Sequence, residues 1–296
     1  MQEACSLRKP PWLKRPLPQG PSYESMRRLI SSAHLNTVCN EAKCPNRFEC
    51  YQGRTATFMI LGDRCTRGCR FCAVQHGEPS PPDANEAVRV ALAIQDLGLT
   101  YAVITSVTRD DLSDGGAGMF QETITMLRKR IASIKVEVLT PDFQGRGEAI
   151  QRVVDAKPDV FGHNIETVKR RYPTVRPGAI YERSLHVLKN VHRLDPSMPI
   201  KSGVMVGLGE TLEELQETFD DLLSSGCTLL TIGQYLSPGK EALPVESYIT
   251  PDQFILLKEL GLKAGFKQIE SGPFVRSSYG AAQMFERLSQ GGRSTR

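Results

Sequence analysis

Hydrophobic positions along this chain alternate between two patterns over most of its length. Short apolar or β-branched runs predict strands, and longer stretches with apolar residues every three or four positions predict helices. The expected strands are 55–61, 101–105, 135–139, 160–164, 200–206, 229–232 and 266–270. The expected helices are 23–33, 84–97, 119–131, 148–156, 181–194, 212–225 and 251–264.

Strands that alternate with helices are typical of parallel βαβ units. Six or seven such units favour an α/β fold of the partial (β/α)6-type TIM barrel, with a doubly wound sheet as the alternative. Barrel enzymes place their chemistry at the carboxyl ends of the strands. Those ends are polar here, so their side chains are expected to line one cavity.

Cysteines are concentrated in the first quarter of the chain, where six of the eight fall within residues 39–72. Cys65, Cys69 and Cys72 form a C-x3-C-x2-C pattern with Phe71 before the last cysteine. Disulfide scaffolds are usually small and secreted, so clustered thiols in a chain of this size indicate a metal. Three close thiolates without an obvious fourth predict an iron–sulfur cluster with one open iron.

A second triplet, C-x4-C-x5-C, precedes the first and consists of Cys39, Cys44 and Cys50. Structural zinc usually uses C-x2-C pairs and four ligands, and neither triplet supplies two such pairs. The spacing therefore favours a second iron–sulfur cluster over zinc. A single site that pools all six cysteines is the main competing interpretation.

Composition excludes several classes of protein. The formal charge of +4, from 37 basic and 33 acidic residues, is too balanced to indicate nucleic-acid binding. Apolar runs are too short for a membrane helix, and residues 1–20 lack the apolar stretch of a secretory signal. Prolines make the first 25 residues an extended arm, which Trp12 is expected to pin to the body. Cys5, in this arm, is expected to be incidental.

Some polar residues have ordinary structural interpretations. Thr211 and Glu214 form a T-x-x-E capping box, and Cys227 is expected to be a small buried hydrophobe. His163 on its own predicts a structural histidine. The segment Arg276-Ser277-Ser278-Tyr279 is, from its residues alone, most simply a helix cap.

Taken together, the motifs resemble those of the lipoyl synthases within the radical S-adenosylmethionine (SAM) superfamily. The resemblance rests on both cysteine triplets in this order and on the terminal R-S-S-Y segment, and it covers residues 35–281. The segments 163–168 (HNIETV) and 201–210 (KSGVMVGLGE) are also similar to the family.

The resemblance implies a radical SAM sulfurtransferase with two [4Fe–4S] clusters. Cys65, Cys69 and Cys72 would hold the cluster whose open iron binds SAM, and reduction would yield a 5′-deoxyadenosyl radical. The triplet Cys39, Cys44 and Cys50 would hold an auxiliary cluster, which supplies sulfur. Its fourth ligand would be Ser277, with Ser278 as the fallback. The residues implied in cofactor binding are Phe71, Ser106, Asn164, Glu166, Arg176, Arg183, Lys201 and Ser202.

The implied reaction inserts sulfur at C6 and C8 of an octanoyl group on a carrier lysine, giving the lipoyl group. The implied partners are lipoyl carrier domains of 2-oxoacid dehydrogenase E2 subunits or glycine cleavage H protein, and ferredoxin or flavodoxin as electron donor. A cytoplasmic monomer without nucleic-acid or membrane partners is expected. The expected domains are an auxiliary-cluster extension (1–53), the barrel (54–270) and a C-terminal extension that closes the auxiliary cluster (271–296). A methylthiotransferase-like enzyme and a zinc-stabilised binding protein are the alternatives.

Overall fold

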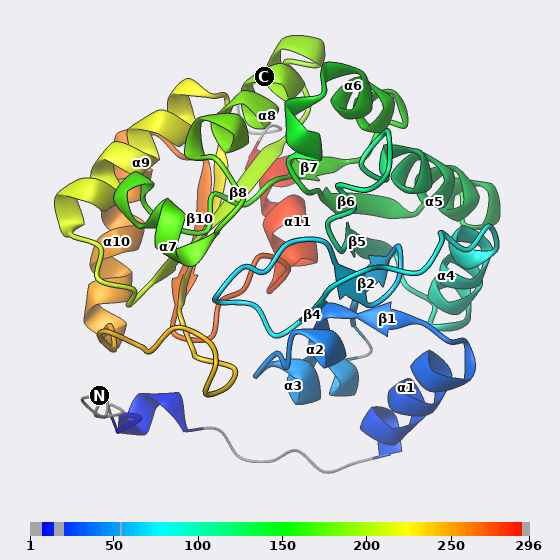
Figure 1. Ribbon diagram of the computed structural model, residues 1–296, viewed down its shortest axis with the longest axis horizontal. Coiled ribbons are helices and arrows are strands. Elements are labelled where there is room, and N and C mark those ends of the chain that lie inside the picture. Colours follow the sequence, from blue (N-terminus) through cyan, green and yellow to red (C-terminus); the bar gives the residue numbers. More distant parts are fainter. Residues whose placement is uncertain (1–7, 15–20, 54, 292–296) are drawn as a thin grey trace. The chain divides into compact units, whose positions relative to one another are not determined.

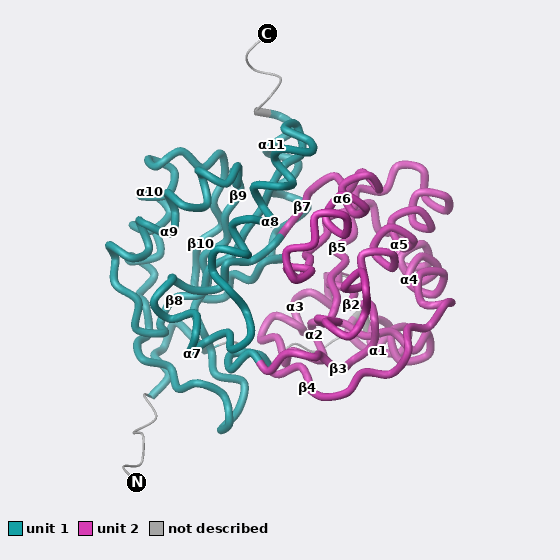
Figure 2. Tube along the Cα trace, turned by 45° about the horizontal axis from the view of Figure 1, so that its top comes forward, with its two compact units in different colours: residues 1–15, 69–72, 163–296 teal, residues 16–68, 73–162 magenta. Residues whose placement is uncertain are grey.

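The computed structural model describes residues 8–14, 21–53 and 55–291 (Figure 1). The chain divides into two compact units, coloured separately in Figure 2. Unit 1 comprises residues 1–15, 69–72 and 163–296, and unit 2 comprises residues 16–68 and 73–162. Of the three cysteines of the C-x3-C-x2-C pattern, Cys65 belongs to unit 2, and Cys69 and Cys72 belong to unit 1.

Unit 2 is built on a sheet whose strands are parallel except at one edge. Its strands lie in the order β1 (Asn36–Thr37), β2 (Thr57–Ile60), β5 (Tyr101–Ser106), β6 (Lys135–Leu139) and β7 (Val160–Gly162), and β1 is antiparallel to β2. Ile60 pairs with Ser106, and Leu139 pairs with Gly162. The loops that follow these strands therefore start side by side at one edge. One of them contains a short ladder of β3 (Arg64–Cys65) and β4 (Gln75–His76).

Helices cover this sheet because each turns an apolar stripe toward the strands. The helices of unit 2 are α1 (Pro21–Ser32), α2 (Val38–Glu41), α3 (Arg47–Gln52), α4 (Glu86–Asp96), α5 (Ala117–Arg130) and α6 (Gly147–Asp155), with the 3-10 turn η2 (Phe143–Gly145). Helices α4, α5 and α6 pack in sequence along the strands (Figure 1). Their apolar faces bury Ile94, Phe120 and Ile150 completely, so the core of unit 2 lies between helices and sheet.

Unit 1 contains three parallel strands and the helices that precede, connect and follow them. The strands are β8 (Ile200–Val206), β9 (Leu229–Gln234) and β10 (Gln268–Gly272), with β9 between the other two. The helices are α7 (Tyr172–Val175), α8 (Tyr181–Leu194), α9 (Leu212–Ser224), α10 (Pro251–Ala264) and α11 (Ala281–Gly291), with the 3-10 turns η1 (Pro11–Leu13) and η3 (Lys169–Arg171). Thr211 caps α9 with the predicted capping box. Cys227 is fully buried, as expected.

The alternating pattern correctly located the main strands and helices, and two deviations affect the site. The strand expected over 160–164 ends at Gly162, and the backbone of Glu166 adopts a left-handed φ of 67°. The pattern did not predict the short helices α2 and α3, which carry Cys39 and Cys50, because four to six residues are too few for a periodic signal.

The anchor of the N-terminal arm is Leu13 rather than Trp12. Trp12 is 37% exposed, whereas Leu13 is 7% exposed. Trp12 was expected to pin the arm because it is the single large aromatic there, but the turn η1 buries its neighbour instead. Cys5 lies outside the described residues.

Truncation of Leu13 should therefore destabilise the protein more than truncation of Trp12. Leu13→Ala removes a buried side chain and should lower the free energy of unfolding by about 2 kcal/mol. Trp12→Ala removes a side chain that is 37% exposed and should cost less, about 1 kcal/mol. Urea unfolding followed by circular dichroism measures both values. A larger loss for Trp12→Ala would contradict this assignment.

Candidate functional site

The segment that carries Cys65 begins with a tight turn at the end of β2. Leu61 and Gly62 adopt left-handed φ angles of 70° and 90°, which reverse the chain immediately after the strand. The side chain of Glu86, at the start of α4, accepts a hydrogen bond from the Leu61 amide at 2.7 Å. This carboxylate is buried, and burial raises its pKa although the amides of Leu61 and Gly62 oppose the shift.

The sulfur of Cys65 already accepts backbone hydrogen bonds. The amides of Arg67 and Thr108 donate to Cys65 Sγ at 3.4 and 3.3 Å. The carbonyl of Cys65 accepts from the Gly77 amide at 3.0 Å. Amide donors to cysteine sulfur are a recurring feature of iron–sulfur sites, where they stabilise charge on the thiolate. The surroundings of Cys65 therefore fit a cluster ligand.

Arg67, which was not among the predicted site residues, ties this segment to two strand ends. Its guanidinium donates to Asp110 at 2.6 and 2.9 Å and to Asp142 at 2.9 and 2.7 Å. Asp110 follows β5, and Asp142 follows β6 and is completely buried. Burial alone would lower the pKa of Arg67, but the two carboxylates raise it, so the side chain stays charged.

In unit 1, the residues from Cys69 to Cys72 form a turn closed by the Cys72 amide, which donates to the Cys69 carbonyl at 3.0 Å. Arg70 fixes this turn on both sides. Its amide donates to the Val175 carbonyl at 3.0 Å, and its carbonyl accepts from the Leu243 amide at 3.0 Å. Phe71 packs against a buried apolar cluster of Val175, Leu208, Tyr235 and Leu243. One side of the turn therefore contacts apolar side chains.

A second group in unit 1 joins Asn164, Glu166 and Ser277. The amide nitrogen of Asn164 donates to Ser277 Oγ at 2.6 Å and to Glu166 Oε1 at 3.0 Å. Asn164 and Ser277 are 113 positions apart in sequence. Gly203 makes room for this contact, because a Cβ there would lie 2.9 Å from Asn164 Oδ1.

The environment of Glu166 perturbs its carboxyl group. Desolvation raises its pKa, and the charges of Arg176 and Arg276 together with the Asn164 hydrogen bond act in the opposite direction. Arg176 is buried and donates to the carbonyls of Asn164 and Ile165 at 3.0 and 3.4 Å. A left-handed non-glycine residue with a perturbed carboxyl is typical of a functional position.

The remaining predicted cofactor residues lie on strands and one helix. Ser202, in β8, accepts the Ile165 amide on its Oγ at 3.0 Å and is fully buried, as is most of Lys201 beside it. Arg183 is half-buried on α8. Ser106, the last residue of β5, has a buried Oγ without a hydrogen-bond partner among the described residues. A buried hydroxyl of this kind at a strand end fits a ligand contact.

The N-terminal triplet is carried by α2, a turn and α3. The Cys44 amide donates to the Cys39 carbonyl at 3.3 Å, which folds the two cysteines into one turn, and Cys50 follows within α3. Burial, with a smaller contribution from the neighbouring thiols of Cys50 and Cys44, raises the pKa of the Cys39 thiol to about 12. A thiol with a raised pKa becomes a thiolate when a metal cation displaces its proton, which is what happens when a cysteine binds a cluster.

The structure thus brings together some predicted residues within each unit. Within unit 1 it joins Asn164, Glu166, Arg176 and Ser277, and within unit 2 it groups Cys39, Cys44 and Cys50. In the described part of the chain, no three His, Cys, Asp or Glu side chains stand at ready metal-ligand geometry. The described cysteines are free thiols, so the disulfide interpretation is not supported among them.

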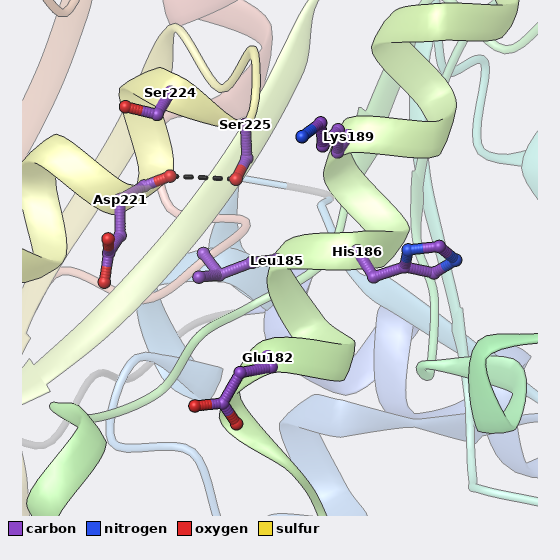
Figure 3. Close-up of a pocket in the computed structure, with 7 residues that line it drawn as sticks. All are labelled: Glu182, Leu185, His186, Lys189, Asp221, Ser224 and Ser225. Atoms are coloured by element: carbon purple, nitrogen blue, oxygen red, sulfur yellow. Dashed lines mark hydrogen bonds between the residues drawn. The ribbon is translucent and has the colours of Figure 1, made fainter.

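A surface pocket of about 310 Å³ lies between α8 and α9 (Figure 3). It is lined by Glu182, Leu185, His186, Lys189, Asp221, Ser224 and Ser225. Ser225 Oγ donates to the Asp221 carbonyl at 2.8 Å, and the acidic and basic groups are mixed. None of the predicted site residues lines this crevice of the helical layer.

Comparison with known proteins first defines a class. Residues 59–222, more than half of the chain, match the Radical SAM superfamily. A crystal structure of methylornithine synthase has a TM-score of 0.57 at 13% identity, with 84% of this chain and 71% of that chain covered. HydG, a maturase of [FeFe]-hydrogenase, also has a TM-score of 0.57, over 71% of this chain and half of that one. The predicted α/β fold of the partial (β/α)6 type is confirmed, and the class implies a [4Fe–4S] cluster and SAM.

Closer relatives define the family. Residues 1–44 match the N-terminal domain of lipoyl synthase. The chain is 53% identical to the lipoyl synthase of Desulfotalea psychrophila, with 96% of this chain and 95% of the relative covered. It is 52% identical to that of Rubrobacter xylanophilus, with 98% and 90% covered. The chain belongs to the lipoyl synthase family, whose members are radical SAM sulfurtransferases. Among the described helices, none combines the length and apolarity that crossing a membrane requires.

Removing the buried charge of Glu86 should change the pH dependence of stability. Because the folded-state pKa of Glu86 is raised, its contribution is fully present below the unfolded pKa and is lost as pH rises through the folded value. Glu86→Gln keeps an acceptor for the Leu61 amide but cannot ionise. The variant should therefore gain stability relative to the parent between about pH 4 and pH 7.

Chemical unfolding at several pH values tests this expectation. Glu148→Gln is the matched control, since Glu148 also lies in the first turn of a helix, α6, but is exposed. Subtracting the control isolates the effect of burial from the effect of losing one charge. An equal pH trend in the two variants would show that burial of Glu86 is not the cause.

Proposed function

We propose that this chain inserts sulfur at C6 and C8 of an octanoyl group that is amide-linked to a lysine of a lipoyl carrier domain. The observation that carries the proposal is the identity of just over half of all positions with lipoyl synthases along nearly the full length. The C–H bonds of an alkyl chain have no acidic proton, so a general base cannot activate them. The protein has to position the chain, bind the reactive groups and exclude water.

Cys65, Cys69 and Cys72 are proposed to hold the SAM-binding [4Fe–4S] cluster. Support comes from the two amides that donate to Cys65 Sγ and from the backbone bonds that hold Arg70. When bound, SAM with this cluster supplies a radical able to remove hydrogen from an alkyl carbon, and an auxiliary cluster supplies the sulfur. Phe71 shields one side of the turn from water through its apolar contacts.

SAM is proposed to contact the polar groups at the strand ends. Its amino, carboxylate and ribose groups need both donors and acceptors. Asn164 and Glu166 offer both kinds beside β8, and Ser106 has a buried hydroxyl available at the end of β5. We assign supporting contacts of the same kind to Arg176, Arg183, Lys201 and Ser202.

An auxiliary [4Fe–4S] cluster is proposed on Cys39, Cys44 and Cys50, with Ser277 as fourth ligand. The Asn164 amide donates to Ser277 Oγ at 2.6 Å, and a donor at this oxygen favours its deprotonated form. This contact supports Ser277 over Ser278. The corresponding division of the chain is an N-terminal extension (1–53), a radical SAM domain (54–270) and a C-terminal extension (271–296).

The proposed partners follow from the reaction. The substrate is carried by lipoyl domains of 2-oxoacid dehydrogenase E2 subunits or by glycine cleavage H protein. Reduction of the cluster requires a low-potential donor such as ferredoxin or flavodoxin. We propose that the chain works as a cytoplasmic monomer without nucleic-acid or membrane partners.

Incubation with an octanoyl-lysyl peptide provides the direct test of function. With SAM and a strong reductant, the anaerobically reconstituted protein should add two sulfur atoms to the peptide, as seen by mass spectrometry. Omitting SAM should abolish the change, because the radical has no other source. Addition of a methylthio group would indicate a methylthiotransferase, and zinc with negligible sulfide would indicate a binding protein.

Replacement of Ser277 by cysteine tests its role as a labile ligand. A hard alkoxide is a weaker partner for cluster iron than a thiolate, so we propose that it allows the auxiliary cluster to be dismantled. Ser277→Cys should retain about eight iron atoms, four per cluster, but insert less sulfur per protein. Iron and sulfide analysis with product mass spectrometry measures both. Ser278→Cys is the paired variant. Normal sulfur insertion by Ser277→Cys would refute the idea, and loss confined to Ser278→Cys would move the ligand to Ser278.

A further inference from the structure

We propose that Arg67 is a positioning residue that aims two backbone amides at Cys65 and thereby raises the reduction potential of the cluster. The inference rests on the proposed function only in taking Cys65 as a cluster ligand. Arg67 itself is not assigned as a ligand of iron or SAM. Its role is to hold the backbone between the first two cysteines of the C-x3-C-x2-C loop.

The first link in this arrangement runs through Arg67 alone. Its backbone amide donates to Cys65 Sγ at 3.4 Å. Its side chain makes four hydrogen bonds, two to Asp110 and two to Asp142. The side chain of Arg67 is 7% exposed and that of Asp142 is 0% exposed, so water cannot easily replace these bonds. The amide that faces the sulfur is therefore fixed to the ends of β5 and β6.

The second link runs through the neighbouring threonines. The Thr108 amide donates to Cys65 Sγ at 3.3 Å, and the Thr108 carbonyl accepts from the amide and the hydroxyl of Thr66, both at 3.0 Å. The Asp110 amide donates to Thr66 Oγ1 at 3.1 Å. Asp110 thus belongs to both links, since its side chain holds Arg67 and its backbone holds Thr66. Shifting the guanidinium would disturb both amides at the sulfur.

The chemical consequence concerns the energy of the reduced cluster. Reduction adds negative charge to the iron–sulfur unit, and amide donors at a cysteine sulfur stabilise that charge, which raises the potential. Only an arginine fork can bind two carboxylates with paired bonds, because lysine presents a single compact ammonium. Arg67→Lys therefore keeps the charge but loses the geometry.

The sharpest test compares Arg67→Lys with Arg109→Lys. Arg109 is also buried and pairs with Asp111 in the same loop. Within the described part of the chain, its guanidinium donates to Asp111 and to the Leu61 carbonyl and does not bridge two carboxylates. Each reconstituted variant is titrated with reductant and followed by electron paramagnetic resonance, and iron content and SAM cleavage are measured in parallel. Variants that lack the auxiliary cysteines isolate the signal of the Cys65 cluster.

Arg67→Lys should shift the midpoint potential to a more negative value and alter the spectrum of the reduced cluster. It should also slow SAM cleavage roughly tenfold. Arg109→Lys should leave the potential unchanged. An unchanged potential and spectrum in Arg67→Lys would overturn the proposal, even if the melting temperature fell. Absence of a SAM-cleaving cluster in the unmodified chain would instead refute the proposed function.

Asp142→Asn provides a second variant if Arg67→Lys does not fold. Asparagine has nearly the same shape but loses one charge and one acceptor for the Arg67 fork. A purely electrostatic role predicts a rise of the potential, because a negative charge is removed. A positioning role predicts a fall, because the amides at Cys65 are no longer held. The sign of the shift therefore supports or overturns the proposal.

Discussion

A buried guanidinium between two carboxylates is the constraint on which the cysteine segment of unit 2 depends. Arg67 joins the loop after β2 to Asp110 after β5 and Asp142 after β6. Removing one member of such a buried network typically costs about 3–5 kcal/mol, because the remaining charge loses its partner in a poorly solvated place. Because the loops after these three parallel strands start side by side, the network can hold the loop that carries Cys65 in a fixed position.

In unit 1, the neutral side chain of Asn164 likewise connects segments that are distant in sequence. The amide of Asn164 binds Glu166 and Ser277 together, so the segment after β7 and the segment after β10 share one hydrogen-bond donor. Glycine makes this approach possible at two positions. A side chain at Gly203 would meet Asn164, and one at Gly233 would lie 2.1 Å from the Val275 carbonyl. In the proposed function, this places the serine next to a SAM contact.

Prediction from the sequence succeeded where the signal was local. The capping box at Thr211 and the buried Cys227 are each contained in a few neighbouring residues. It failed for Arg67, whose partners lie 43 and 75 positions away. It also assigned the anchor of the arm to Trp12, whereas Leu13 is the more deeply buried residue. The size of a side chain does not determine its direction within a turn.

By itself, the sequence determined the class of chemistry and the order of strands and helices. The spacing of the thiols and the period of the hydrophobic residues are local properties of the sequence. Because helices and strands have fixed periods, and cluster loops have short cysteine spacings, these properties can be read without the tertiary structure. Only the tertiary structure decided which distant polar groups meet. Asn164 donates to Ser277, and Arg67 donates to Asp142. These contacts form because the loops that follow parallel strands all begin at the carboxyl ends of the strands. Buried polar groups must then satisfy one another there, since water is excluded.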